Sequence, residues 1–214
     1  MPLALIVRHA QAAGNVEHRF IGQSDVPLDS LGRRQAQALA ARLAPLPVSG
    51  IISSDLARAV DTMTPIAEHL GVTIRTDARL REINNGEWSG LLPSEIAERW
   101  PVLWEAYISG DDVERPGGET WAEVRARSLS AISELTRLEG TVLICTHGGP
   151  ALNLARWALG IPSGGNIFKG SLGAVANTGI TAIELAGPRL ISFNDVGHLT
   201  NQAHDLRLAF DPIE

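Results

Sequence analysis

The chain has 214 residues, of which 44% are hydrophobic and 20% are charged, and its formal net charge is −6. This balance is typical of a globular protein with a sizeable core, and it excludes disordered and fibrous classes. Because nucleic-acid binding depends on many basic side chains that neutralise phosphates, an acidic chain predicts no nucleic-acid partner.

Cysteine usage and the N-terminal residues indicate the cellular compartment. Cys145 is the only cysteine, which excludes an intramolecular disulfide and a thiolate zinc site and favours a cytoplasmic protein. The first apolar run, Leu3–Val7, is too short for a signal peptide or a membrane span. We therefore expect no membrane partner, and a monomer or a homodimer.

Apolar runs alternate with segments of helical periodicity along the whole chain. This pattern predicts an α/β fold, a three-layer αβα sandwich in which helices cover both faces of a mostly parallel sheet. A single domain over residues 1–214 is expected. The predicted strands, of which the third is the weakest, are Leu3–Val7, Gly50–Ser53, Val72–Arg75, Thr141–Cys145, Gly179–Leu185 and Arg189–Phe193.

Start signals for four helices lie between these strands. The residues expected to cap or begin them are Ser30, Ser54, Thr120 and Pro150. Thr120 and Glu123 form a capping box, and Gly71 is expected to close the second helix.

A segment of different composition, rich in tryptophan, lies at about residues 83–118 and predicts a small helical lid inserted into the domain. Its large aromatic residues are Trp88, Trp100, Trp104 and Tyr107. Because aromatic side chains bury much area, we favour packing against the sheet for them, with direct substrate contact as the alternative.

Two histidines follow predicted strands directly. Arg8 and His9 come after the first strand, and His147 and Gly148 come after the strand that ends at Cys145. Since α/β folds build their sites at the carboxyl ends of parallel strands, we expect the two histidines to meet there. An arginine beside an imidazole at such an edge indicates the handling of an anion.

The predicted strand Gly50–Ser53 leads into Ser54, and Arg58 lies in the helical turn that follows. A cation is disfavoured near a helix N-terminus, which carries the positive end of the macrodipole, so Arg58 requires an anionic partner. That partner is either a bound ligand or a nearby carboxylate such as Asp55 or Asp61.

These residues, in their order and spacing, resemble the histidine phosphatase superfamily, which also contains phosphoglycerate mutases. The resemblance spans nearly the whole chain. The matching segments are Arg8-His9-Ala10, Asn15, Arg19-Phe20-Ile21-Gly22-Gln23, Ser53-Ser54-Asp55-Leu56 with Arg58, Leu80-Arg81-Glu82, Gly86-Glu87-Trp88, Pro116-Gly117-Gly118-Glu119 and Thr146-His147-Gly148-Gly149.

The resemblance implies a metal-independent phosphomonoester hydrolase that needs no cofactor and acts on a small phosphorylated metabolite. It implies that His9 is the nucleophile that forms a phosphohistidine, and that Glu82 is the proton donor. The same resemblance implies that Arg8, Arg58 and His147 are catalytic residues that hold the phosphate oxygens. It implies phosphate or substrate binding by Asn15, Gly22, Gln23 and Gly148. Without the resemblance, Glu82 would be interpreted as a surface carboxylate paired with Arg79 or Arg81.

Ala10 stands where the family usually has glycine, so the backbone there must accept a Cβ atom. Some compact phosphohistidine-directed phosphatases of the superfamily also resemble Arg-His-Ala, although they generally lack this lid and the matched glutamate.

Other chemistries lack their motifs. A cysteine phosphatase needs an arginine six residues after the thiol, where this chain has Ala151, and Phe168 precedes Lys169 where a phosphate-binding loop requires glycine. The histidines show no helical ligand spacing, so we expect no metal.

Two alternative functions remain open in the sequence. One is a silent member that only binds a phosphorylated ligand. The other is a phosphoglycerate mutase, which the absence of lysine between Glu82 and His147 disfavours. The arginines of that interval are Arg99, Arg115, Arg125, Arg127 and Arg137. We expect structural or solvated roles for the last three and a substrate contact from Arg115.

Overall fold

The computed structural model describes residues 2–13, 19–137, 139–170 and 172–202. Its six strands form one sheet in the order β3-β2-β4-β1-β5-β6. The strands are β1 (Leu3–Arg8), β2 (Val48–Ser53), β3 (Ile74–Thr76), β4 (Thr141–Thr146), β5 (Ile180–Glu184) and β6 (Arg189–Asp195). All six predicted strands are present, the weakest of them shifted toward its C-terminus.

β5 is the one strand of the sheet that runs against the others. The pairs β2–β3, β2–β4 and β1–β4 are parallel, whereas β5 is antiparallel to both of its neighbours, β1 and β6. The start of β5 therefore lies at the same edge as the end of β1. The prediction of a mostly parallel sheet is confirmed.

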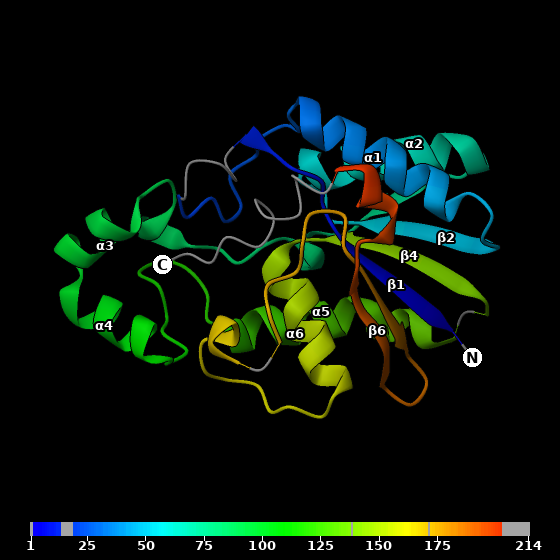
Figure 1. The fold of residues 1–214 in the computed structure, drawn as a ribbon. Helices are drawn as coiled ribbons and strands as arrows, with labels where there is room; N and C mark the ends of the chain where they lie inside the picture. The colour runs from blue at the N-terminus through cyan, green and yellow to red at the C-terminus, as the bar shows by residue number, and fades with distance from the viewer. Residues whose placement is uncertain (1, 14–18, 138, 171, 203–214) are drawn as a thin grey trace.

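The helices are α1 (Ser30–Leu43), α2 (Ala57–Leu70), α3 (Pro93–Arg99), α4 (Pro101–Ser109), α5 (Trp121–Ser133) and α6 (Gly148–Ala158). Short 3₁₀ turns are Ala78–Leu80, Gly86–Trp88, Glu134–Arg137, Ile167–Lys169 and Gly197–Gln202. α1 and α2 cover one face of the sheet, and α5 and α6 cover the other (Figure 1). The predicted αβα layers are confirmed.

Two apolar clusters fill the two interfaces of this sandwich. One joins Leu39 of α1 and Met63 of α2 to the β-sheet, and the other joins Val124 of α5 and Leu152 of α6 to its opposite face. Each fully buried side chain of this size contributes about 1.5–3 kcal/mol of transfer free energy. The sheet that carries the site is thus held from both sides.

Three of the predicted helix starts need correction. Asp29, not Ser30, caps α1, because its side chain accepts the Gly32 N–H. Ser54 does not cap α2, which begins at Ala57 without a cap from its own N-cap side chain. α6 begins at Gly148, two residues before Pro150. The capping box of Thr120 and Glu123 and the left-handed closure of α2 at Gly71 are confirmed.

The segment at 83–118 carries α3 and α4 as a lobe beyond the carboxyl-terminal edge of the parallel strands (Figure 1). Its aromatic residues pack against one another and not against the sheet, which corrects the expectation. Trp88 is fully buried, with Phe20, Trp104 and Tyr107 around it at ring-centroid distances of 5.6 to 6.1 Å. The segment therefore has a small core of its own.

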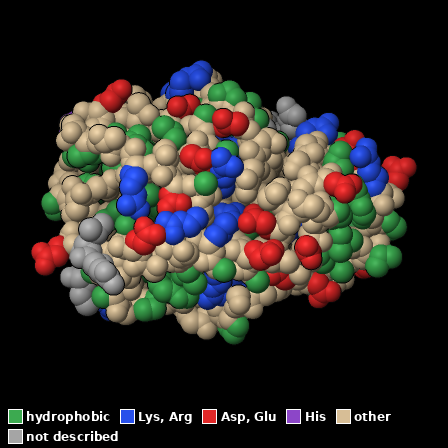
Figure 2. All heavy atoms as spheres, turned by 180° about the vertical axis from the view of Figure 1, so that it is seen from behind, with side chains coloured by type: hydrophobic (Ala, Val, Ile, Leu, Met, Phe, Trp, Pro, Cys, Tyr) green, Lys and Arg blue, Asp and Glu red, His purple; other side chains and the backbone are tan. Residues whose placement is uncertain are grey.

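Acidic and basic side chains are interspersed on the face seen from behind (Figure 2). Toward the lower right of that view, on the side of the helical lobe, acidic side chains predominate. The cations that matter for an anion, Arg8 and Arg58, are instead gathered inside the molecule, where Arg58 is only 2% exposed.

Candidate active site

β1, β4 and β2 end side by side, and the next residues along the chain are His9, His147 and Ser54. The backbone ladder continues through this step, because His9 N donates to the Thr146 carbonyl at 2.9 Å and Ser54 N to the Cys145 carbonyl at 2.8 Å. The two imidazole rings lie with their centroids 5.0 Å apart. The predicted meeting of the two strand-end histidines is confirmed.

The ring of His9 is held in one tautomer. Its Nδ1 lies 2.7 Å from the Ala10 carbonyl, which can only accept, so Nδ1 carries the proton and Nε2 carries the lone pair. Burial, with the guanidinium groups of Arg58 and Arg8, holds the pKa of His9 well below its usual value. The free protein therefore presents a neutral imidazole whose Nε2 is unprotonated, as a nucleophile requires.

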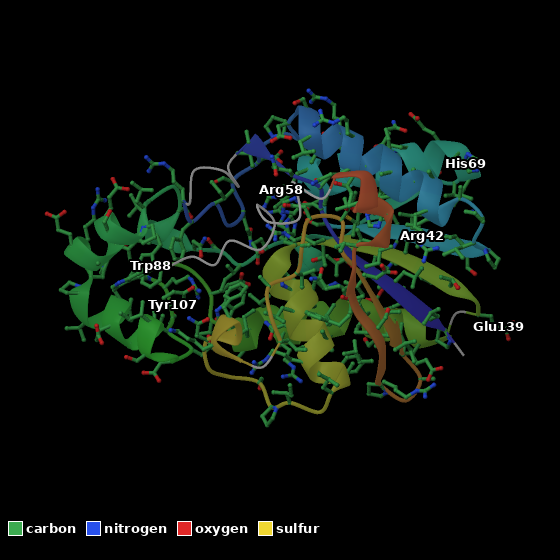
Figure 3. All side chains as sticks on the ribbon, in the orientation of Figure 1. Arg42, Arg58, His69, Trp88, Tyr107 and Glu139 are labelled. Carbon is green, nitrogen blue, oxygen red and sulfur yellow. The ribbon has the colours of Figure 1, made fainter. Side chains whose placement is uncertain are left out.

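Arg58 of α2 contacts this nitrogen and not a carboxylate. Its Nε lies 3.3 Å from His9 Nε2, while Nη1 and Nη2 donate to the carbonyls of Ser24 and Gly22, each at 2.7 Å. No ion pair of Arg58 with Asp55 or Asp61 occurs in the described part of the chain. Figure 3 shows Arg58 between the sheet edge and the lobe, and the opposite charges that act on its guanidinium are those of Glu82 and Asp25.

Arg8 and His147 each keep a buried nitrogen without a partner among the described residues, Nε in Arg8 and Nδ1 in His147. Arg8 is fixed by Nη1, which donates to the Val175 carbonyl at 2.6 Å, and His147 by Nε2, which lies 2.8 Å from Ser54 Oγ. Burial, together with the positive charges of Arg58, Arg8 and Arg127, holds the pKa of His147 well below its usual value. The N–H of Arg8 Nε is a free donor that suits an oxygen atom of a phosphoryl group, and His147 Nδ1 can serve in the same way when it carries a proton.

The carboxyl group of Glu82 is held by two backbone N–H groups. Ile83 N donates to Oε1 at 2.9 Å, and Gly149 N, in the first turn of α6, donates to Oε2 at 3.1 Å. The ring of Trp121 closes the same spot, because a Cβ atom on Gly149 would lie 2.3 Å from its Cζ3 and 2.5 Å from Glu82 Oε1. Glu82 therefore lies beside Gly149, two residues after His147 in the chain.

Glu82, which is half-buried, does not form the alternative ion pair with Arg79 or Arg81. Arg81 pairs with Asp55 through two hydrogen bonds of 2.7 and 2.5 Å, and Arg79 pairs with Asp77 and with Glu134, each at 2.7 Å. These pairs satisfy both arginines that stood as candidate partners of Glu82.

The remaining predicted binding residues lie around this group. Gly22 adopts a φ of +52° and its carbonyl accepts from Arg58, while Gln23 Nε2 donates to the Glu82 carbonyl at 3.0 Å. Gly148 lies against Arg8, whose Nε is 3.6 Å from the position of an added Cβ atom. Asn15 falls outside the described residues.

Ala10 is accommodated without backbone strain. Its φ is not positive, its side chain is fully buried with Leu28 and Ala36, and its N–H donates to Thr62 Oγ1 at 2.9 Å. The methyl group thus fills a small apolar space behind the nucleophile. Thr62, which fixes this turn from α2, was not predicted from the sequence.

Asn177 and Thr178 are further residues that sequence reasoning missed. Asn177 Nδ2 donates to the His9 carbonyl at 2.9 Å, and Thr178 N donates to the Arg8 carbonyl at 3.0 Å. Thr178 holds a φ of 56°, and His198 Nε2 contacts its Oγ1 at 2.9 Å. The available signal was a polar pair just before an antiparallel strand, but the direction of that strand could not be read from its composition.

Comparison with known proteins identifies the family to which this chain belongs. The family model described as histidine phosphatase superfamily (branch 1) matches residues 4–195. The chain belongs to the histidine phosphatase superfamily. Glucosyl-3-phosphoglycerate phosphatase of Mycobacterium tuberculosis (strain CDC 1551 / Oshkosh) is 35% identical over 168 residues, which are 74% of this chain and 75% of the relative.

A second similar sequence and a solved structure show which other members of the superfamily this chain resembles. A probable phosphoglycerate mutase of Yersinia pestis is 35% identical over 166 residues, which are 74% of this chain and 75% of the relative. A solved structure of mycobacterial glucosyl-3-phosphoglycerate phosphatase with VO3 matches with a TM-score of 0.78 and 34% identity, covering 90% of this chain and 98% of that one. The predicted family and its phosphomonoesterase class are confirmed.

The structure adds two observations on partners. Within the described ranges, no helix combines the length and apolar character needed to cross a bilayer. In the same part of the chain, no cluster of three or more histidine, cysteine, aspartate or glutamate side chains is arranged to hold a metal ion.

Proposed function

We propose that this chain hydrolyses a small phosphomonoester through a phosphohistidine on His9. The observation that carries the proposal is the neutral ring of His9, with Nδ1–H on the Ala10 carbonyl and Nε2 beside the guanidinium of Arg58. Phosphoryl transfer requires mainly in-line placement and stabilisation of charge on the oxygens, which fixed cations around a nucleophile supply.

In the first step His9 Nε2 attacks phosphorus and the ester P–O bond breaks. Glu82 gives its proton to the leaving oxygen, while Arg8, Arg58 and His147 bind the phosphoryl oxygens. In the second step Glu82 takes a proton from water, whose oxygen attacks phosphorus and breaks the N–P bond. Inorganic phosphate and the alcohol are the products, and Glu82 returns to its protonated form.

Trapping of the intermediate tests this mechanism. We expect His9→Ala to abolish turnover of p-nitrophenyl phosphate, and an alkaline quench of the wild-type protein to retain acid-labile phosphate on His9. His69, an exposed histidine on α2 that lies far from Arg58 in Figure 3, provides the matched control as His69→Ala. Turnover that survives in His9→Ala, or label on another residue, would refute the mechanism.

Hydrolysis is favoured over isomerisation by the arginines between Glu82 and His147. A mutase needs a second set of cations that holds a bisphosphorylated intermediate, yet Arg115 donates to the Glu119 carbonyl and Arg125 to the Ile161 carbonyl. Arg115 is 1% exposed, with its guanidinium 5.1 to 5.6 Å from three aromatic rings. The guanidinium of Arg115 is thus engaged by groups of the protein itself, which disfavours a second phosphate site at this residue.

A coupled assay with 3-phosphoglycerate and 2,3-bisphosphoglycerate, run beside phosphate detection, separates the two activities. Phosphate release that exceeds isomerisation is expected, and the reverse would favour the mutase. The segment 83–118 acts as a lid in this proposal, and its contacts choose among sugar phosphates, phosphoglycerate derivatives and related metabolites. Turnover should survive EDTA. A cytoplasmic location and a monomeric or homodimeric state stay predictions.

A further inference from the structure

Arg127 of α5 uses every N–H of its guanidinium on one loop and one carboxylate. Nη1 donates to the carbonyls of Arg79 and Arg81 at 2.8 and 2.6 Å, and Nη2 donates to the carbonyl of Glu82 at 2.8 Å. Nε and Nη2 also donate to the two carboxylate oxygens of Glu119, at 2.8 and 3.0 Å. A guanidinium has five N–H donors, so five contacts fill its capacity.

Glu119 extends this arrangement to the far side of Glu82. Its Oε2 accepts Asn84 N at 2.8 Å, and its own N–H donates to the Asn84 carbonyl at 2.9 Å. The pair of Arg127 and Glu119 is only 18% and 21% exposed, so solvent competes weakly for these contacts. Residues on both sides of Glu82 are therefore bound by one ion pair.

The loop needs such partners because it lacks regular secondary structure. Glu82 lies between the 3₁₀ turns Ala78–Leu80 and Gly86–Trp88, where no strand or α-helix ladder takes up the carbonyl groups. Gln23 supplies one more donor to the Glu82 carbonyl. A planar guanidinium can bridge successive carbonyls and a carboxylate at once, which the single nitrogen of a lysine cannot do.

We propose that Arg127, paired with Glu119, is a positioning residue that aims the carboxyl group of Glu82 at the leaving oxygen. The inference rests on the proposed function, because it takes Glu82 as the proton donor. Arg127 bonds to the backbone of Glu82 and not to its carboxyl group, so its effect passes through the placement of that side chain. Among the described residues, the guanidinium of Arg127 forms no hydrogen bond with Arg8, Arg58 or His147, which keep their own partners. Its only effect on that group is electrostatic, because its positive charge contributes to the lowered pKa of His147.

Substrates whose leaving groups differ in basicity distinguish a positioning role of Arg127 from a purely structural one. An alkyl phosphate expels a strongly basic alkoxide and depends on protonation by Glu82, whereas p-nitrophenyl phosphate expels a stable phenolate. Since kcat/KM reports the steps up to loss of the leaving group, it is the quantity to compare between the two substrates. A variant that merely unfolds in part lowers both values by the same factor.

The experiment measures kcat/KM for an alkyl phosphate and for p-nitrophenyl phosphate in Arg127→Gln and in Arg127→Lys. We expect a loss of about 10²-fold for the alkyl phosphate, as a displacement near 1 Å produces, and a loss of only a few-fold for p-nitrophenyl phosphate. Vanadate affinity should change less than about threefold. Arg127→Lys keeps the charge and the stem, and it provides a folded protein if Arg127→Gln is too unstable to assay.

Arg125→Gln is the matched control, since Arg125 lies on the same helix and donates to the distant Ile161 carbonyl. It should leave the ratio of the two kcat/KM values at the wild-type level. Equal losses for both substrates in the Arg127 variants, or no loss in either, would overturn the inference. Glu82→Gln distinguishes failure of the proposed role of Arg127 from failure of the proposed role of Glu82. If this variant does not selectively lower kcat/KM for the alkyl phosphate, the proposed role of Glu82 itself fails.

Discussion

Substitution of Gly149 by alanine tests the placement of Glu82 from the side of its carboxyl group. Gly149 lies in the first turn of α6, and a Cβ atom there would meet Trp121 Cζ3 at 2.3 Å, Trp121 Cη2 at 2.6 Å and Glu82 Oε1 at 2.5 Å. Carbon atoms in contact normally lie about 3.5–4.0 Å apart. Both neighbours must therefore move, or the backbone at Gly149 must shift, by about 1 Å.

The two neighbours differ in their freedom to move. Trp121 is 3% exposed and its ring packs edge-on against Phe168 at a centroid distance of 5.4 Å, so displacement of the indole disturbs the core. Overpacking of this kind costs about 1–3 kcal/mol of unfolding free energy, offset by at most about 1 kcal/mol from replacing a helical glycine. Displacement of the Glu82 carboxyl group instead lowers turnover, by about 10²-fold for 1 Å.

Urea unfolding and kcat/KM for an alkyl phosphate measure the two effects. Gly148→Ala is the matched control for stability, because its Cβ atom would find only Arg8, at ordinary contact distances of 3.6 to 3.8 Å. We expect Gly149→Ala to be less stable than Gly148→Ala by about 1–3 kcal/mol. Equal stability of the two variants, with kcat/KM of Gly149→Ala near that of the wild type, would refute the close packing around Glu82.

Two further predictions concern titration and reactivity. The folded protein holds His9 and His147 neutral, whereas the unfolded chain protonates them below about pH 6.5. Because the unfolded state then binds more protons, the free energy of unfolding should fall as the pH drops below that value. The expected slope is up to about 1.4 kcal/mol per pH unit for each histidine. Urea titrations at pH 7.5 and 5.5 measure this slope, and a variant with both histidines replaced by asparagine should flatten it. Burial raises the pKa of the Cys145 thiol, so a disulfide reagent should label it only after unfolding, and rapid labelling of the native protein would contradict its burial.

The strands could be predicted because their signal is local. Runs such as Val142–Cys145 are apolar throughout, as a strand covered on both faces requires, and the structure buries these residues between two helical layers. The cap of α1 was harder, because Asp29 and Ser30 are adjacent and both residue types cap helices. The direction of β5 was out of reach, since strand composition carries no orientation.

The residues of the site also fall into those that a local sequence motif predicts and those that depend on tertiary contacts. His9, Arg58, Glu82 and His147 could be found because each belongs to a short matched motif, and the structure brings these four together. Arg127 could not be found, since an arginine on an amphipathic helix has the same local pattern whether it faces solvent or a loop far away in the sequence. Its role exists only in tertiary contacts, over sequence separations of 45 to 48 residues to the carbonyls it binds.

The same positive charges serve both halves of the proposed reaction. In the free protein, burial and the guanidinium groups of Arg58 and Arg8 favour the neutral form of His9, which leaves Nε2 with the lone pair that attack requires. A bound phosphate dianion neutralises much of that field, so the cost of protonating His147 falls once substrate is present. The Nδ1 atom of His147, which has no partner in the described structure, can then donate to a phosphate oxygen as a cation. We therefore expect substrate binding to favour a protonated His147, while the tautomer of His9 stays fixed by the Ala10 carbonyl.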